Sequence, residues 1–205
     1  MNILSIDFDW IMQPTIEAYN NMCKGYNNLG PIEIWDEISR MMPGFNPECD
    51  LNRFTDLYFL LKDKLKHLTK EDIHIGVNHD ELYYFMEKQQ AKKYSVYNID
   101  HHHDLGYLNT NSPSIEEQPI SLANWATKAH QNLNMYRYTW ISNINSHKPE
   151  EVPEKLKYTA TYDLNILENV KFDKIFICAS WEWVPLKYQN LFAILTSLFD
   201  DLENK

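Results

Sequence analysis

Short apolar runs alternate with longer amphipathic segments along this chain of 205 residues. Several of the short runs alternate apolar with polar residues, which is typical of strands. Strands are expected at about 2–8, 72–77, 94–100, 136–142 and 174–179, with a less regular one at 156–162. In the longer segments apolar residues recur at helical spacing, as Leu57, Leu61 and Leu65 do. Helices are expected near 15–23, 31–41, 53–67, 79–90, 122–132 and 186–203.

The regular alternation of strands and helices predicts a single α/β domain over 1–205. We expect three αβα layers, in which helices cover both faces of a mostly parallel central sheet. With only 5 glycines, the chain has no glycine-rich phosphate loop. A long polar connection at 105–121 follows a predicted strand, and such a loop is usually a lid or else disordered.

Charge and cysteine usage narrow the possible partners and the compartment. The net charge is -10, from 29 acidic and 19 basic residues, which argues against a nucleic-acid partner. Cys23, Cys49 and Cys178 form no C-x-x-C pair, so neither a zinc ribbon nor a disulfide framework is indicated, and Cys178 is expected to be a small core residue. The sequence shows no signal peptide and no apolar run of membrane-spanning length, so we expect a cytoplasmic protein without membrane contact.

The first candidate site is the run from Asp100 to Asp104, which follows a predicted strand directly. Alternate side chains of an extended chain share a face, so Asp100, His102 and Asp104 can point into one pocket. Two carboxylates this close need a cation between them, and the histidine adds a nitrogen ligand. The sequence therefore favours a metal site here over a solvated polar strand end.

Two further segments place metal-binding residue types at strand ends. Asp7 and Asp9 lie two residues apart at the end of the first apolar strand, where open α/β sheets deliver their ligands. His79 follows the predicted strand 72–77 at a strand-to-helix corner, and Asn78 can cap a helix starting near it. Taken alone, His79 fits an ordinary helix residue better, but beside the other two clusters a ligand role is favoured.

Glu182 lies between Trp181 and Trp183, just after the last predicted strand. A carboxylate walled by indole rings can pair with a guanidinium or ammonium group and let it stack. The alternative is a surface glutamate beside two core tryptophans, and the local sequence does not separate the two interpretations.

Three of these segments resemble signatures of the arginase/deacetylase superfamily. Asp100-x-His102-x-Asp104 resembles its D-A-H-x-D motif, and the segment 5–9 (Ser-Ile-Asp-Phe-Asp) resembles S-x-D-x-D. The segment 76–80 shares a glycine and the histidine of G-G-D-H-S. Two departures are that the S-x-D-x-D element comes first here, whereas arginases carry it later, and that the chain is much shorter. With the late S-W-E-W-V-P segment, the pattern is most similar to the peptide arginases, which convert arginine to ornithine within ribosomally made peptides.

The resemblance implies an arginase-like fold and a cytoplasmic manganese-dependent ureohydrolase with two Mn²⁺ ions. It assigns six metal ligands: Asp7 and Asp100 as bridges between the ions, His79 and Asp104 to complete one ion, and Asp9 and His102 to complete the other. A water held between the ions would attack the guanidinium carbon and release urea.

The resemblance also implies roles beyond the ligands. Glu182 would hold the guanidinium, Trp10 would form part of the pocket wall, and His101 or His103 would pass a proton to the leaving amine. We expect a peptide substrate because the residues beside the motifs are aromatic, and no polar set for a free α-amino acid is apparent.

Two alternatives remain open at this stage. The run 3–10 also fits a haloacid-dehalogenase-like phosphatase, with Asp7 as nucleophile and Asp9 as acid/base, but that assignment leaves D-x-H-x-D unexplained. The other is a metal-stabilised binding module without turnover, which long loops and tryptophans would serve equally well.

Overall fold

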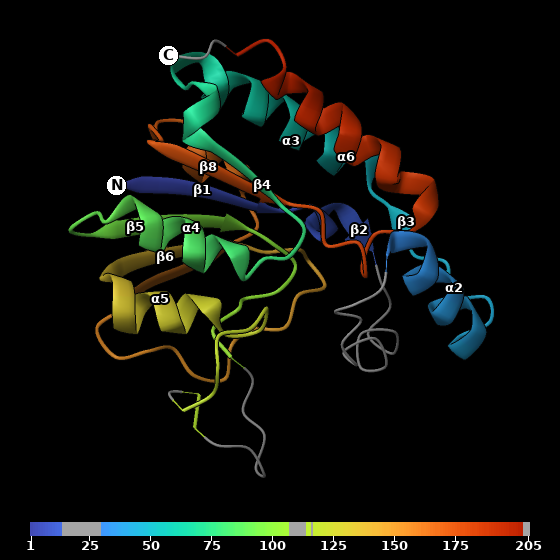
Figure 1. The fold of residues 1–205 in the computed structure, drawn as a ribbon, viewed down its shortest axis with the longest axis horizontal. Helices are drawn as coiled ribbons and strands as arrows, with labels where there is room; N and C mark the ends of the chain where they lie inside the picture. Colours follow the sequence, from blue (N-terminus) through green and yellow to red (C-terminus); the bar gives the residue numbers. More distant parts are fainter. Residues whose placement is uncertain (14–29, 107–113, 116, 203–205) are drawn as a thin grey trace.

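The computed structural model describes residues 1–13, 30–106, 114–115 and 117–202, and its centre is a six-stranded sheet (Figure 1). The strand order is β4-β8-β1-β5-β6-β7, and all five pairings are parallel. Each strand matches one predicted from the pattern: β1 (Asn2–Asp7), β4 (Ile73–Gly76), β5 (Tyr94–Ile99), β6 (Met135–Ile141), β7 (Lys157–Thr161) and β8 (Lys174–Cys178). The expected α/β class is confirmed.

Five α-helices are described: α2 (Pro31–Met41), α3 (Leu51–Lys64), α4 (Glu81–Gln89), α5 (Trp125–Leu133) and α6 (Gln189–Thr196). Short 3-10 turns join or extend the elements: η1 (Phe8–Ile11), η2 (Leu65–His67), η3 (Lys70–Asp72), η4 (Leu164–Leu167), η5 (Leu186–Tyr188) and η6 (Ser197–Phe199). The long helix predicted at 186–203 is thus η5, α6 and η6 in succession. The helix predicted at 15–23 lies outside the described residues.

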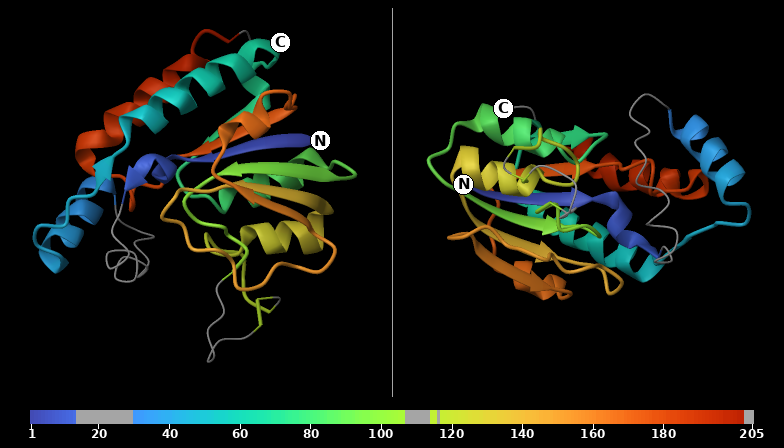
Figure 2. Two further views of the ribbon diagram at one scale, coloured as in Figure 1. Left: turned by 180° about the vertical axis from the view of Figure 1, so that it is seen from behind. Right: turned by 90° about the horizontal axis from the view of Figure 1, so that it is seen from below.

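Helices cover both faces of the sheet, with α3 and α6 on one side and α4 and α5 on the other (Figures 1 and 2). The alternation in β1 sets this arrangement, because successive side chains point to opposite faces. Leu4 and Ile6 join the apolar core under α3 and α6, whereas Ile3 joins the core under α4 and α5. By the same period, Ser5 and Asp7 face the α4/α5 side, so polar groups collect there near the carboxyl ends of the strands.

The start of α4 differs from the prediction. Asn78 does not cap the helix, which begins at Glu81 after Asp80. Instead the Glu81 carboxylate accepts hydrogen bonds from the backbone N–H groups of Val77 and Asn78, both at 2.9 Å. This leaves His79 in a turn between strand and helix, where its ring can reach back over the sheet.

Two small features were not predicted. β2 (Met12–Gln13) and β3 (Glu48–Cys49) form an antiparallel pair separate from the main sheet.

Gly106 has a φ of +96°, and an added Cβ would lie 2.5 Å from the Ile115 side chain, so this position requires glycine. Gly106 also donates its N–H to the Ala123 carbonyl at 2.7 Å, which ties the start of the 105–121 connection to its far end. Positions 107–113 and 116 lie outside the described residues, so a lid remains a prediction.

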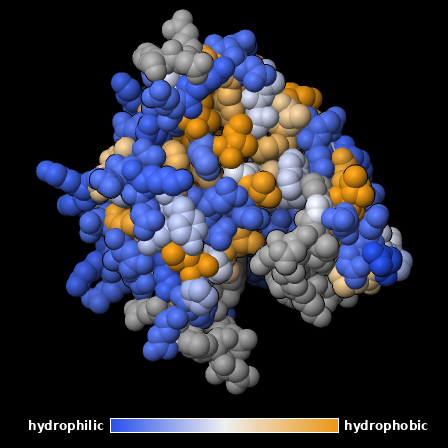
Figure 3. Space-filling view, viewed as in Figure 1, coloured by the Kyte–Doolittle hydropathy of each residue, from blue (hydrophilic) through white to orange (hydrophobic). Residues whose placement is uncertain are grey.

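The surface in Figure 3 is mostly hydrophilic, as the acidic composition leads one to expect. No helix in the described ranges is both long enough and apolar enough to cross a membrane.

Candidate metal centre

All six predicted metal ligands converge at the carboxyl edge of the sheet. β8, β1 and β5 are neighbours that run parallel, so their ends meet at one edge, and the turn after β4 brings His79 over it. His79 Nδ1 lies 3.2 Å from Asp7 Oδ2, 3.0 Å from Asp100 Oδ2 and 2.9 Å from Asp104 Oδ2. One imidazole nitrogen thus faces three carboxylates from two other segments.

A second histidine serves the other part of the cluster. His102 Nδ1 lies 3.1 Å from Asp9 Oδ2 and 3.9 Å from Asp100 Oδ1. The ligand atoms of Asp9, Asp100 and His102 lie within 4.8 Å of one another, and so do those of His79, Asp100 and Asp104. The two sets share Asp100, and all their members are buried except His102, which is partly exposed. This buried cluster could hold a metal ion.

The carboxylates of the cluster lie so close together that an added positive charge stabilises them. Burial, together with the neighbouring charge of Asp7, raises the pKa of Asp9 to about 7. Burial and the charge of Asp104 raise the pKa of Asp100 to about 8. Burial alone would lower the pKa of a histidine, yet the adjacent carboxylates raise the pKa of His102 to about 10 and that of His79 well above its usual value. These shifts have one direction in common, because each favours added positive charge in the cluster, from protons or from a cation.

Hydrogen bonds from surrounding residues orient the ligands. Ser5 Oγ lies 2.8 Å from His79 Nε2, which leaves Nδ1 directed at the carboxylates. The Trp125 indole N–H donates to Asp104 Oδ2 at 2.6 Å, and the Asn98 amide donates to Asp100 Oδ2 at 2.9 Å. Such outer hydrogen bonds fix ring and carboxylate orientation in metal centres.

Two buried ligand atoms of the cluster, His79 Nδ1 and Asp9 Oδ2, make short ion-pair contacts but no hydrogen bond of standard geometry among the described residues. A cation between the ligand atoms would satisfy both. Carboxylate oxygens and one imidazole nitrogen per set are ligand types that bind divalent metal ions.

The backbone is strained at the same edge. Asp104 has a φ of +50° and Ser180 a φ of +42°, although neither is glycine. Asp tolerates this left-handed conformation better than most residues, and at Asp104 it turns the chain directly after the cluster. Backbone strain of this kind collects at functional sites.

Glu182 lies on a loop whose Trp183 ring packs beside the ring of His102. Burial raises its pKa to about 7, and the negative charges of Asp7 and Asp9 add to the rise. The Trp183 ring lies 4.9 Å from the His102 ring, so the loop that carries Glu182 contacts a predicted ligand. The Trp35 indole on α2 donates to the Trp181 carbonyl at 2.8 Å and holds this loop.

Trp10 and His101, the other two predicted site residues, are both buried. Trp10 is 3% exposed and packs in the core under α3 and α6, with the Arg53 guanidinium 5.0 Å from its ring centre. Its place in a pocket wall remains a prediction. His101 is buried, and burial together with the charge of His102 lowers its pKa to about 2. A group that passes protons works best with a pKa near the working pH, so this environment does not favour His101 for that task.

His103, the other candidate for proton transfer, is buried like His101. Its Nδ1 accepts the Leu105 N–H at 3.1 Å, which fixes the ring as a structural acceptor. Burial lowers its pKa to about 4.

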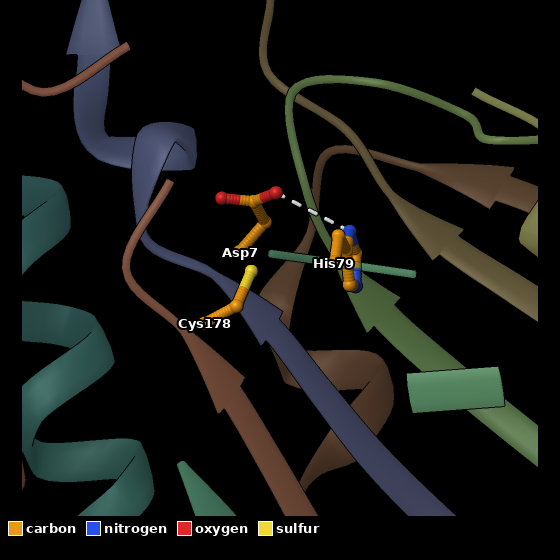
Figure 4. Close-up of side chains that lie close together, drawn as sticks. All are labelled: Asp7, His79 and Cys178. Carbon is orange, nitrogen blue, oxygen red and sulfur yellow. Dashed lines mark ion pairs between the residues drawn. The ribbon is translucent and has the colours of Figure 1, made fainter. Parts of the chain in front are cut away.

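Several residues of the site were missed by sequence reasoning. Asn98 and Trp125 are single residues without a motif, and only the fold brings them to the cluster. Cys178 is buried, as predicted, but its Sγ also belongs to a third candidate ligand group, with Asp7 and His79. Figure 4 shows these three side chains together. In the sequence, the one sign of this role for Cys178 was its position at the end of a predicted strand, where the other predicted ligands also lie.

Comparison with protein-family models, curated proteins and solved structures finds no match to this chain. The site itself is therefore the basis for any functional proposal.

Proposed function

We propose that this chain is a manganese-dependent ureohydrolase that converts an arginine side chain within a peptide to ornithine, with release of urea. The observation that carries the proposal is the pair of ligand sets sharing Asp100, with Glu182 on an adjacent loop. The motif resemblance to peptide arginases, with its cytoplasmic setting and peptide-modifying role, agrees with this arrangement.

The proposal includes two Mn²⁺ ions, one for each ligand set. Asp9 and His102 would hold one ion, His79 and Asp104 the other, and Asp100 would serve both. Asp7, 3.2 Å from His79 Nδ1, is the candidate for a second bridge. When bound, such a pair of ions supplies a water that ionises near neutral pH for attack on the guanidinium carbon.

Glu182 supplies the substrate contact in this proposal. A partly buried carboxylate such as that of Glu182 can form a strong, often bidentate, pair with a guanidinium group. The positive charge of the guanidinium group would also offset the repulsion from Asp7 and Asp9, which contributes to the raised pKa of Glu182. Glu182 thereby orients the guanidinium beside the ligand sets without being a ligand itself.

A peptide substrate is favoured by the surroundings of the Glu182 loop. Trp35, Trp181 and Trp183 join the apolar cluster of α2, and such rings suit an aliphatic side chain and a flanking peptide backbone. The net charge of -10 would also draw a cationic peptide toward the protein, an effect that weakens with salt.

The test is urea release from an arginine-containing peptide and from free arginine by protein loaded with Mn²⁺, with mass spectrometry to locate ornithine. We expect turnover of the peptide and little of the free amino acid. Glu182→Gln should keep the bound metal but lose most activity, whereas Glu150→Gln, at an exposed glutamate, should behave as wild type.

Other outcomes would contradict the proposal in distinct ways. Loss of metal in Glu182→Gln would make Glu182 a ligand. Phosphatase activity without urea release would favour catalysis by Asp7 and Asp9, and bound metal without any turnover would favour a binding module.

A further inference from the structure

Cys178 places a thiol at the metal-binding edge of the sheet, and the proposed function does not use it. It ends β8, the strand between β4 and β1, and pairs in register with Asp7 on one side and Gly76 on the other. Its side chain faces the α4/α5 side with Phe176, as expected for residues two apart. The parallel register of β1 and β8 therefore brings this sulfur beside Asp7.

The surrounding atoms form a set that can hold a cation. The ligand atoms of Asp7, His79 and Cys178 lie within 4.8 Å of one another, and all three residues are buried (Figure 4). His79 is only 2% exposed, and its Nδ1 lies 3.2 Å from Asp7 Oδ2, 3.0 Å from Asp100 Oδ2 and 2.9 Å from Asp104 Oδ2, without a hydrogen bond of standard geometry among the described residues. Cys178 Sγ contacts Ser180 Oγ at 3.5 Å, a weak interaction that fixes the thiol without occupying it fully.

The chemistry of this set differs from that of the two oxygen-rich sets. Sulfur, imidazole and carboxylate ligands together suit Zn²⁺ and its thiophilic analogue Cd²⁺, whereas a sulfur ligand adds little to the binding affinity for Mn²⁺. A bound thiophilic cation deprotonates a coordinating thiol outright, so burial of Cys178 as a neutral thiol does not prevent binding.

We propose that Asp7, His79 and Cys178 form a third metal site, selective for thiophilic divalent cations. This site shares Asp7 and His79 with the proposed manganese centre. The two modes of binding therefore compete, and capture of Zn²⁺ or Cd²⁺ withdraws His79 from Asp100 and Asp104.

The experiment is titration of the metal-free full chain with Cd²⁺, followed by the ultraviolet sulfur-to-cadmium charge-transfer band, with Mn²⁺ binding measured separately by calorimetry. Wild-type protein should show the band. Cys178→Ser should abolish it and weaken Cd²⁺ binding by about tenfold or more, while Mn²⁺ affinity changes by about twofold at most. Cys49→Ser and Cys23→Ser, which alter the other two thiols, should retain the band.

The proposal is overturned if wild-type protein shows no band, if the band survives in Cys178→Ser, or if it is lost only in a control variant. Should Cys178→Ser fold poorly, Cys178→Ala is the second variant, and its Mn²⁺ binding reports whether the centre is intact. Urea release by the manganese form is a separate measurement, so either proposal can fail without the other.

Discussion

Trp125 on α5 donates its indole N–H to Asp104 Oδ2 at 2.6 Å, and both residues are buried. Trp125 also packs against the His79 ring, with 5.0 Å between ring centres. A single helix residue therefore supports two members of one ligand set, although it follows Asp104 by 21 positions in the sequence.

We expect Trp125→Phe to weaken Mn²⁺ binding about 10- to 100-fold, because it removes the hydrogen bond that orients Asp104 while keeping most of the ring packing. Calorimetric titration with Mn²⁺ measures the change. Trp35→Phe is a matched control, since it removes an indole N–H that serves the Glu182 loop instead. Equal affinity in Trp125→Phe and wild type would show that Asp104 needs no such support.

Asp100 belongs to both oxygen-rich ligand sets, so its loss should remove metal-dependent stability. At a hundredfold excess over Kd, Mn²⁺ should stabilise the wild type by about 2.7 kcal/mol, or raise Tm by about 5 to 10 °C. Asp100→Asn should show little of this increase in a thermal melt, and Asp56→Asn, on the exposed side of α3, should show all of it. A full increase in Asp100→Asn would remove Asp100 from the centre.

Metal binding should release protons and weaken as pH falls. The pKa values of Asp9, Asp100 and His102 are raised to about 7, about 8 and about 10, so these groups hold protons near neutrality that a metal ion must displace. Raising the pH removes this competition, and apparent Mn²⁺ affinity should increase as pH passes upward through the Asp9 value. Calorimetry in buffers of different ionisation enthalpy counts the protons; a pH-independent affinity without proton release would contradict this charge balance.

The hydrogen bond from Trp35 to the Trp181 carbonyl predicts a selective effect on substrate binding. Trp35→Phe should free the Glu182 loop and raise KM for the peptide about fivefold, the equivalent of about 1 kcal/mol for one lost hydrogen bond. Mn²⁺ affinity should stay unchanged, because the hydrogen bond removed holds the Trp181 carbonyl and not a predicted ligand. Steady-state kinetics with metal-saturated enzyme test this prediction. A change in Mn²⁺ affinity without a change in KM would contradict it and would show that α2 supports the metal centre instead.

The elements of the fold follow closely from the pattern of apolar positions. β1 shows why, since Leu4 and Ile6 face one core and Ile3 the other, an alternation that is local and visible in the sequence. The strand order is not local. Nothing in the apolar run 174–178 shows that it lies between β4 and β1, because that position depends on packing of the whole sheet.

The residues of the candidate site likewise fall into those that a local sequence pattern predicts and those that only the fold brings together. Asp100, His102 and Asp104 were found from their spacing. The chain is not extended there, because β5 ends at Ile99 and Asp104 has a φ of +50°, yet the structure brings them together with Asp7, Asp9 and His79. Asn98, Trp125 and Cys178 have no such spacing and could be assigned only once the fold placed them. Trp10 lies in the core after the η1 turn, and its expected place in a pocket wall stays a prediction.

The place of β8 in the sheet has a consequence for how the protein assembles. β8 is the last strand in the sequence, yet it is the sole strand neighbour of β4 in the described sheet and one of two neighbours of β1. While the chain emerges from the ribosome, β4 has no partner to pair with until residues near 178 have been made. His79 therefore reaches Asp7 only after this late insertion, and such long-range pairing is slow. The metal centre should accordingly form only after β8 has been made, and until then β4 has no strand partner in the described sheet.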